Sequence, residues 1–269
     1  MKQNLTEYNT ISTNALKLCA IIAMVCDHLP YLLENWHILY YSFPWVLMHA
    51  AGRLTAPIFF YLLALGYRRT RNANSYTLRL IIFAFLSYIP YIWYFKGGLP
   101  SPSNFLELNV IFTMLFGLLL LRVAHEIRNM PRKIILAALC LIGGYWCDYS
   151  LYGLAMIVVC DIARENRRSV ILGMGAVMMV YVYMRTSNWF PSDVSPFTSL
   201  LTLFKTEWMV GSLIVLLSLI IPLVLISRHR IWAVGAPEEA RPGLLAKWGF
   251  YIFYPAHITA LLLIKSFFL

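Results

Sequence analysis

Charged residues are scarce in this sequence. Asp, Glu, Lys and Arg make up 13% of its 269 residues, whereas hydrophobic residues make up 60%. A soluble domain carries roughly 25% charged residues. This scarcity argues against an ordinary soluble enzyme and predicts an integral membrane protein, with the lipid bilayer as a constant partner.

Acidic residues are the scarcer of the two charge types. The chain has 22 Lys and Arg against 12 Asp and Glu, a formal net charge of +10. Such an excess can indicate nucleic-acid binding. Here, however, the basic residues form short clusters between apolar stretches, a pattern that the positive-inside rule explains better. We therefore expect no nucleic-acid partner.

Residue patterns for metal or redox chemistry are also missing. The five cysteines form no C-x-x-C pair, and no two of the six histidines are three or four residues apart. The H-E-x-x-H, G-x-S-x-G, P-loop and G-x-G-x-x-G motifs are absent. The first fourteen residues lack the apolar region and cleavage site of a signal peptide. We expect no metal and no removable leader.

What the chain has in abundance is long apolar stretches. We predict an all-α polytopic membrane bundle of about nine transmembrane helices, which residues 1–269 form as a single domain. The predicted spans are 15–33, 44–67, 76–95, 107–123, 133–147, 149–163, 168–184, 207–227 and 246–268.

The connections between these spans alternate in charge. Seventeen of the 22 basic residues fall on one side, including Lys17 and the group Arg68, Arg69, Arg71 and Arg79. The positive-inside rule then puts the N-terminus in the cytoplasm and, with nine spans, the C-terminus outside. The predicted outer loop 185–206 contains Trp189, Pro191 and Pro196, and it could form a lid.

Two of the predicted spans are too short to cross a bilayer. Residues 133–147 and 149–163 are about 15 residues each, against the ~20 that a spanning helix needs. We therefore expect a hairpin over 133–163 whose tip lies within the membrane. Irregular backbone at that depth is tolerated only where protein buries it or where it lines an aqueous cavity.

Several polar residues are predicted to lie at one depth. Depth can be estimated from the ~1.5 Å rise per residue of a helix. His28 and His257 are each roughly 15 Å from the inner interface, and Asp148 is ~22 Å from it. Arg53 is ~14 Å from the outer interface. Ionisable groups within a membrane are candidates for function by default. Their common depth predicts a polar cavity.

Each of these residues also has a structural explanation. Asp27 and His28 could satisfy backbone groups that Pro30 frees, and His257 could be a hydrogen-bonded structural histidine. Arg53 could form an ion pair with Asp27. Asn109 and Thr113 could make hydrogen bonds that pack helices together. We assign no role to the four remaining histidines, which are His37, His49, His125 and His229.

The spacing of Lys17 and His28, with ten residues between them, resembles the R/K-x10-H signature of the membrane acyltransferase superfamily. Collinear blocks over residues 15–165 and 245–265 resemble the TraX family more closely. These blocks are Leu16-Lys17 to Asp27-His28, Gly52-Arg53-x-x-Ala56-Pro57-Ile58-Phe59, Leu78-Arg79-Leu80, Asn109-Val110-x-Phe112-Thr113, Asp148-Tyr149-x-x-Tyr152-Gly153 and Phe253-Tyr254-Pro255-x-His257.

This resemblance implies acetyl-CoA-dependent N-acetylation, known in the family for the amino terminus of conjugative pilin, in the bacterial plasma (inner) membrane. His28 would be the catalytic base, assisted by His257 and Asp27. The substrate-binding residues would be Arg53, Asn109, Asp148, Tyr149 and Tyr254. Acetyl-CoA would bind through Lys17, Arg68, Arg69, Arg71 and Arg79. The acceptor, a pilin, peptide or other small molecule, would come from the outer side.

Two other classes of protein fit the same pattern. Broken spans and a polar site at mid-depth are also features of transporters. The chain could equally be a non-catalytic membrane subunit of a conjugation or secretion apparatus. Against a transporter, the sequence has no paired inverted halves and no second carboxylate for ion coupling.

Overall fold

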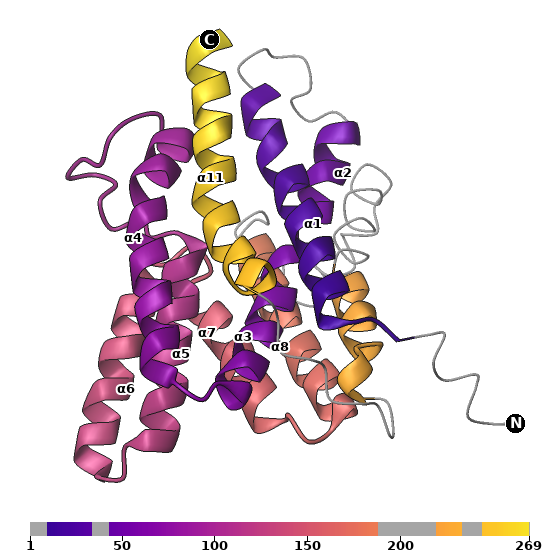
Figure 1. The fold of residues 1–269 in the computed structure, drawn as a ribbon, viewed down its shortest axis with the longest axis vertical. Helices are drawn as coiled ribbons and strands as arrows, with labels where there is room; N and C mark the ends of the chain where they lie inside the picture. The colour runs from indigo at the N-terminus through magenta and orange to yellow at the C-terminus, as the bar shows by residue number, and fades with distance from the viewer. Residues whose placement is uncertain (1–9, 34–42, 188–218, 233–243, 269) are drawn as a thin grey trace, which may run out of the picture.

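The computed structural model describes residues 10–33, 43–187, 219–232 and 244–268 (Figure 1). Apart from two isolated bridges, its regular structure there is helical. The helices are α1 (Thr13–Leu33), α2 (Phe43–Gly52), α3 (Thr55–Arg69), α4 (Ala73–Lys96), α5 (Val110–Glu126), α6 (Met130–Tyr145), α7 (Ser150–Ile162), α8 (Arg167–Ser187), the short 3-10 helix η3 (Arg230–Trp232) and α11 (Leu244–Phe268).

Each predicted span that falls within the described residues coincides with helical structure. By length and composition, four helical stretches in this part of the chain are able to cross a membrane: Thr13–Leu32, Leu47–Arg69, Ala73–Lys96 and Trp248–Phe267. The all-helical, membrane-like class is thereby confirmed, and the count of nine transmembrane helices stays a prediction. The predicted lid 185–206 and most of the predicted span 207–227 lie outside the described residues.

The predicted span 44–67 corresponds to the helical stretch Leu47–Arg69, which is interrupted by a turn at Arg53 and Leu54. The amide of Arg53 donates to the carbonyl of Ala50, and α3 starts afresh at Thr55. Pro57 then lies in the first turn of α3, where its missing N–H costs no helical hydrogen bond. The break leaves Arg53 at the junction of two helices that follow each other in one stretch.

One end of the bundle gathers the basic ends of the helices. There Arg68 of α3 contacts His125 of α5 and Asp161 of α7, and Arg122 of α5 contacts Asn74 of α4. The predicted cytoplasmic segments therefore lie together, as the positive-inside rule requires. The C-terminus lies at the opposite end (Figure 1). Which end faces the cytoplasm stays a prediction.

The α6–α7 hairpin ends beside the middle of the bundle. Asn109, which precedes α5, donates to the carbonyl of Ala84 at the midpoint of α4. The amide of Asp148 at the hairpin tip donates to the carbonyl of Leu108 at 2.8 Å. The tip is therefore level with the midpoint of α4, ~17 Å along a helix that is ~36 Å long. Figure 1 shows α6 rising only to this height.

Small residues allow the hairpin to pack closely on its neighbours. A Cβ at Gly153 of α7 would lie 2.6 Å from Thr113 Cγ2 and 2.8 Å from Tyr149 Cβ. Glycine at a helix contact lets two backbones approach each other, which is a common device in membrane helix packing. Gly153 thus fixes the position of the Asp148-Tyr149 turn against α5.

We predict that Gly153→Ala destabilises the protein by about 1–3 kcal/mol, because the added methyl group overpacks this contact. Thermal unfolding of the detergent-solubilised protein measures the effect. Gly98→Ala is the matched control, since no described atom lies within 4 Å of its Cβ position. Equal unfolding temperatures for the two variants would contradict the packing account.

Candidate functional site

Two histidines from opposite ends of the chain form the centre of the candidate site. His28 Nδ1 of α1 lies 2.8 Å from His257 Nε2 of α11. The two rings are nearly parallel, at 10°, with centroids 5.0 Å apart. The short nitrogen–nitrogen distance and the shared plane are the geometry of an in-plane N–H···N hydrogen bond. The sequence predicted these histidines at one depth, and the structure brings them into direct contact.

The surrounding backbone selects the tautomer of each ring. His257 Nδ1 lies 2.9 Å from the carbonyl oxygen of Phe253, which can only accept a hydrogen bond. In a neutral His257 the proton is therefore on Nδ1, and Nε2 is the acceptor. His28 must then donate from Nδ1, which leaves its Nε2 with a lone pair. This is the protonation state that a general base needs.

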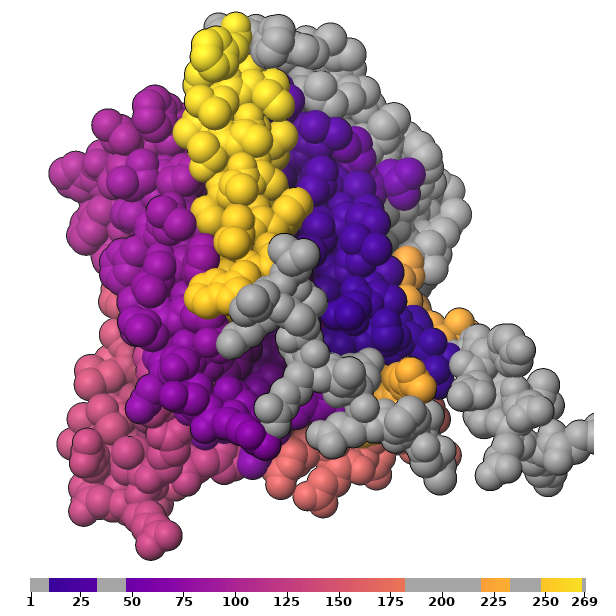
Figure 2. Space-filling model, viewed as in Figure 1, coloured from indigo at the N-terminus to yellow at the C-terminus, as the bar shows by residue number. Residues whose placement is uncertain are grey.

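Aromatic side chains hold both rings in place. Phe253 stacks on the His257 ring at 4.8 Å and 8°, and Phe95 of α4 meets the His28 ring edge-on at 5.1 Å. Tyr94 donates its hydroxyl to the carbonyl oxygen of His28 at 2.8 Å. Residues of α1, α4 and α11 thus hold the pair, and Figure 2 shows α11 on the surface between α4 and α1.

Asp27 has a different partner from the one predicted. Its Oδ1 lies 2.9 Å from His49 Nδ1 of α2, whereas we expected an ion pair with Arg53. Gly52 permits the approach, since a Cβ there would lie 2.2 Å from Asp27 Cβ. His49, to which the sequence assigned no role, is therefore part of the site. Its only sequence signal is its place three residues before Gly52, in the block that resembles the TraX family.

Arg53 and the hairpin tip complete a polar layer next to the histidines. Arg53 interacts electrostatically with Asp27 and with the hydroxyl group of Tyr149. Tyr149 and Tyr254 in turn interact with Asp148. The Arg53 and Asp148 side chains remain exposed although the hairpin tip is level with the middle of the bundle. The predicted grouping of these residues is thus found in space.

Asn109 has a structural role in this arrangement. It is fully buried, its Oδ1 accepts from the amide of Ile111 at 3.0 Å, and its Nδ2 donates to Ala84 at 3.1 Å. One amide group therefore caps α5 and ties it to α4. Of the two interpretations open for Asn109, substrate binding and helix packing, the geometry favours packing.

A second polar cluster lies at the basic end of the bundle. Arg68 Nε donates to Asp161 Oδ1 at 2.6 Å, and His125 Nε2 lies 2.7 Å from Asp161 Oδ2. His229 likewise lies 2.8 Å from Tyr61 Oη and 3.0 Å from Thr13 Oγ1. The view that His125 and His229 have no role is corrected, because both join helices that are distant in sequence.

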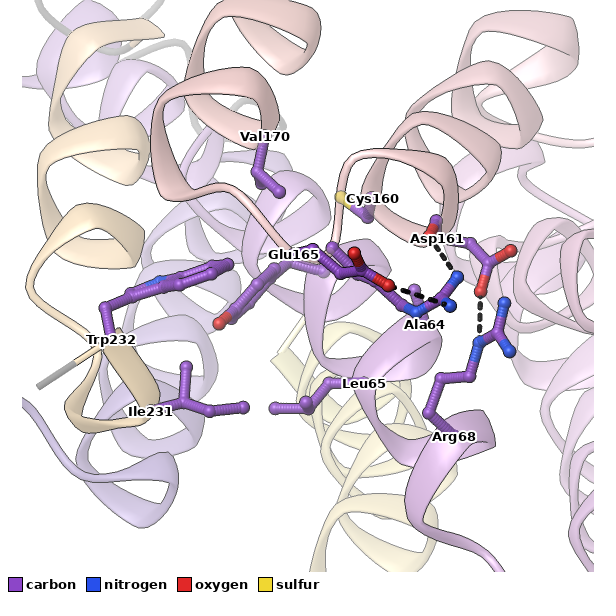
Figure 3. A pocket seen from close by; sticks show the side chains of 11 residues that line it. Ala64, Leu65, Arg68, Cys160, Asp161, Glu165, Val170, Ile231 and Trp232 are labelled. Atoms are coloured by element: carbon purple, nitrogen blue, oxygen red, sulfur yellow. Dashed lines mark hydrogen bonds and ion pairs between the residues drawn. The ribbon is translucent and has the colours of Figure 1, made fainter. Parts of the chain in front are cut away.

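A pocket of about 260 Å³ opens beside Arg68 and Asp161. Trp232 and Ile231 lie across it from these two charged residues (Figure 3). The pocket is far from the histidine pair. The hydroxyl group of Thr55 on α3 donates to the carbonyl of Ala20 on α1, so these two residues are at the same height. Helices α1 and α3 run in opposite directions from this contact. Arg68 is therefore about 30 Å below His28 along the helix axes.

The predicted donor-binding residues are thus spread over different depths. Arg68, Arg69 and Arg71 lie at the far basic end, whereas Lys17 is ~16 Å below His28 on the same helix. Arg79 on α4 packs against the rings of Tyr76, Trp248 and Tyr251, its guanidinium carbon within 5.6–5.9 Å of each centroid. In the described part of the chain, no three His, Cys, Asp or Glu side chains form a group that could hold a metal ion.

The fold and the site define a class: a helical, membrane-type protein with a histidine pair and an arginine–carboxylate layer at mid-height. The chain belongs to the TraX family, since the family model for the TraX protein matches residues 12–265. It is also 26% identical over 258 residues to the "Probable fimbrial assembly protein FimC, serogroup H1" of Dichelobacter nodosus, covering 94% of this chain and 95% of that protein. No solved structure matches the chain.

We predict that Asp161→Ala destabilises the protein by about 3 kcal/mol, because it leaves the half-buried Arg68 without its carboxylate. The Asp161 side chain is 5% exposed. Glu165→Ala is the control, since that side chain is 84% exposed in its pair with Arg164 and should contribute less than about 1 kcal/mol. Chemical or thermal unfolding in detergent compares the two, and a ranking in the reverse order would refute the role of Asp161.

Proposed function

We propose that this protein is a membrane acetyltransferase that transfers an acetyl group from cytoplasmic acetyl-CoA to an amino group of an acceptor. The observation that supports this most directly is the His28–His257 hydrogen bond, since it leaves His28 Nε2 with a free lone pair beside a polar layer. N-acetylation needs a base of this kind, because the attacking amine must lose a proton.

The proposed reaction uses His28 as general base and then as general acid. The amine nitrogen attacks the thioester carbonyl carbon, and Nε2 of His28 accepts the proton that the nitrogen releases. The carbon–sulfur bond then breaks, and the coenzyme A sulfur leaves with a proton returned from the His28 imidazolium. The products are the acetylated amine and free coenzyme A, and no other reactant is needed.

His257 and Asp27 support the charge that His28 acquires. When His28 becomes an imidazolium, its Nδ1–H continues to donate to His257 Nε2, so the hydrogen bond becomes charge-assisted and stronger. Asp27 is adjacent in sequence and interacts electrostatically with His28. His49 holds the Asp27 carboxylate in position. In this proposal His28 is the catalytic residue, and His257, Asp27 and His49 are positioning residues.

The polar layer above the hairpin is the proposed acceptor site. Asp148 can bind the ammonium form of the acceptor and accept one of its protons, which leaves the neutral amine for attack, and the hydroxyl groups of Tyr149 and Tyr254 are nearby. Arg53 is always charged and can bind a carboxylate or carbonyl oxygen of the acceptor. An acceptor with an amine next to a carbonyl group, such as a peptide amino terminus, matches this pair of charges.

The cellular context follows from the family and the relative. The name of the relative from Dichelobacter nodosus concerns fimbrial assembly. We propose a related setting for this chain, with a pilin or small membrane peptide as the acceptor. We place the protein in the bacterial inner membrane as a multi-pass protein, with the basic end of the bundle in the cytoplasm. Acetyl-CoA then reaches the histidines from the basic end, and the acceptor reaches them from the other.

We predict that His28→Ala abolishes acetyl transfer but leaves the fold intact, since the side chain is only half-buried. The loss should be at least about 100-fold, the range of general-base catalysis. Transfer of labelled acetyl groups to peptide amino termini, with size-exclusion profiles as the folding control, measures it. Normal turnover in a normally folded His28→Ala protein would remove His28 from the mechanism.

We predict that His257→Gln retains more activity than His257→Ala. The Gln amide oxygen can accept the Nδ1–H of His28 and keep its tautomer, whereas Ala leaves that donor without an acceptor. His257→Ala should lose roughly 10- to 100-fold in kcat with little change in KM, the pattern for a group that acts on the transition state. If His257→Gln were as impaired as His257→Ala, the tautomer argument would fail.

A further inference from the structure

The side chain of Arg79 is a cation in an unusual environment. Its guanidinium lies against three aromatic rings of α4 and α11, those of Tyr76, Trp248 and Tyr251. Its Nε is buried and has no hydrogen-bond partner among the described residues. Within the same part of the chain it has no carboxylate partner, in contrast to Arg68, Arg122 and Arg164. The positive charge of Arg79 and its buried Nε–H are thus without an anionic partner among the described residues.

Trp248 supplies a flat surface next to this cation. Trp248 is 36% exposed, and no described atom lies within 4 Å of the Cβ position of the adjacent Gly249. An aromatic face beside an arginine suits a nucleotide, whose base stacks on the ring while its phosphates bind the guanidinium. A phosphate alone would use the arginine but would gain nothing from the indole.

The depth of this cluster matches the length of the acetyl donor. Helices α4 and α11 run in the same direction, since Phe83 packs on Tyr251 at 5.5 Å and Tyr94 contacts Lys265 nearer the other end. Trp248 is therefore about 14 Å below His257 along α11. The pantetheine arm has about 13 bonds between the pyrophosphate and the sulfur, and it reaches ~15 Å when it is extended at ~3.5 Å per three bonds.

The other predicted phosphate-binding arginines do not satisfy this length. Arg68 is about 30 Å below His28, which is twice the reach of the arm, and its Nε is engaged by Asp161. Arg69 and Arg71 follow it in sequence at the same end. Lys17 lies at a depth similar to that of Arg79.

We propose that Arg79 and Trp248, with Tyr76 and Tyr251, form the site for the nucleotide end of coenzyme A. The adenine stacks on Trp248, the pyrophosphate binds Arg79, and the arm extends along α11 toward the histidine pair. This inference rests on the proposed acetyl-CoA-dependent function. It names one of the four predicted arginines as the pyrophosphate site and adds two residues of α11, Trp248 and Tyr251, that the sequence prediction did not include.

Calorimetric binding of coenzyme A and of adenosine 3′,5′-bisphosphate to the full-length protein in phosphatidylcholine nanodiscs tests the site. We expect Arg79→Gln to weaken both ligands by about tenfold or more, and Trp248→Leu by roughly fivefold. Arg128→Gln, an exposed arginine in the α5–α6 turn, is the control and should stay within about twofold. Thermal unfolding verifies that each variant is folded.

The outcomes separate this proposal from the one on which it rests. Wild-type protein that binds no coenzyme A contradicts the proposed function itself. Wild-type binding that Arg79→Gln and Trp248→Leu leave unchanged overturns only the nucleotide site. A headgroup phosphate is the other source of an anion for Arg79. If exchanging phosphatidylcholine for phosphatidylglycerol stabilises the wild type but not Arg79→Gln, and neither nucleotide binds at Arg79, the site belongs to lipid and the nucleotide proposal is refuted.

Discussion

The hydrogen bond between His28 and His257 is the contact on which the arrangement of the candidate site depends. It joins α1 to α11, across 229 residues of sequence, with polar atoms placed among largely apolar helices. Unpaired polar groups in such surroundings cost several kcal/mol, so each ring needs the other. His257 Nδ1 donates to the Phe253 carbonyl, and the Tyr94 hydroxyl donates to the His28 carbonyl oxygen. The hydrogen bonds that stabilise the pair also determine which nitrogen of each ring is protonated, and they leave a lone pair on His28 Nε2.

The polar layer next to this pair depends on two breaks in regular structure. The helix interruption at Arg53 and Leu54 brings a charged side chain to mid-height, and the turn between α6 and α7 brings Asp148 to the same height. Close packing at Gly52 and Gly153 makes both positions possible, since a Cβ at either residue would collide with a neighbouring side chain. Charged and polar groups from five segments therefore meet where a bilayer would exclude isolated ones.

Much of this arrangement could be predicted from the sequence, and the failures have a common cause. Apolar length located the helices, and ~1.5 Å per residue placed His28, His257, Arg53 and Asp148 in one layer. Contacts between helices could not be predicted, because they depend on how each helix is rotated. The Asp27–His49 pair was missed for this reason, as were the contacts of His125 and His229. The helix break before Pro57 had a visible signal, since proline favours a first turn, but a continuous apolar stretch concealed it.

The central claim is that acetyl-CoA is the donor, and the most direct measurement is its binding to the purified wild-type protein. Calorimetry with acetyl-CoA should be combined on the same sample with transfer of a labelled acetyl group to small peptides that have free amino termini. The account predicts micromolar binding and label on the peptide amino group. Absence of binding at millimolar acetyl-CoA, with a folded protein, would contradict the account and leave a transporter or a non-catalytic assembly subunit as the function to test.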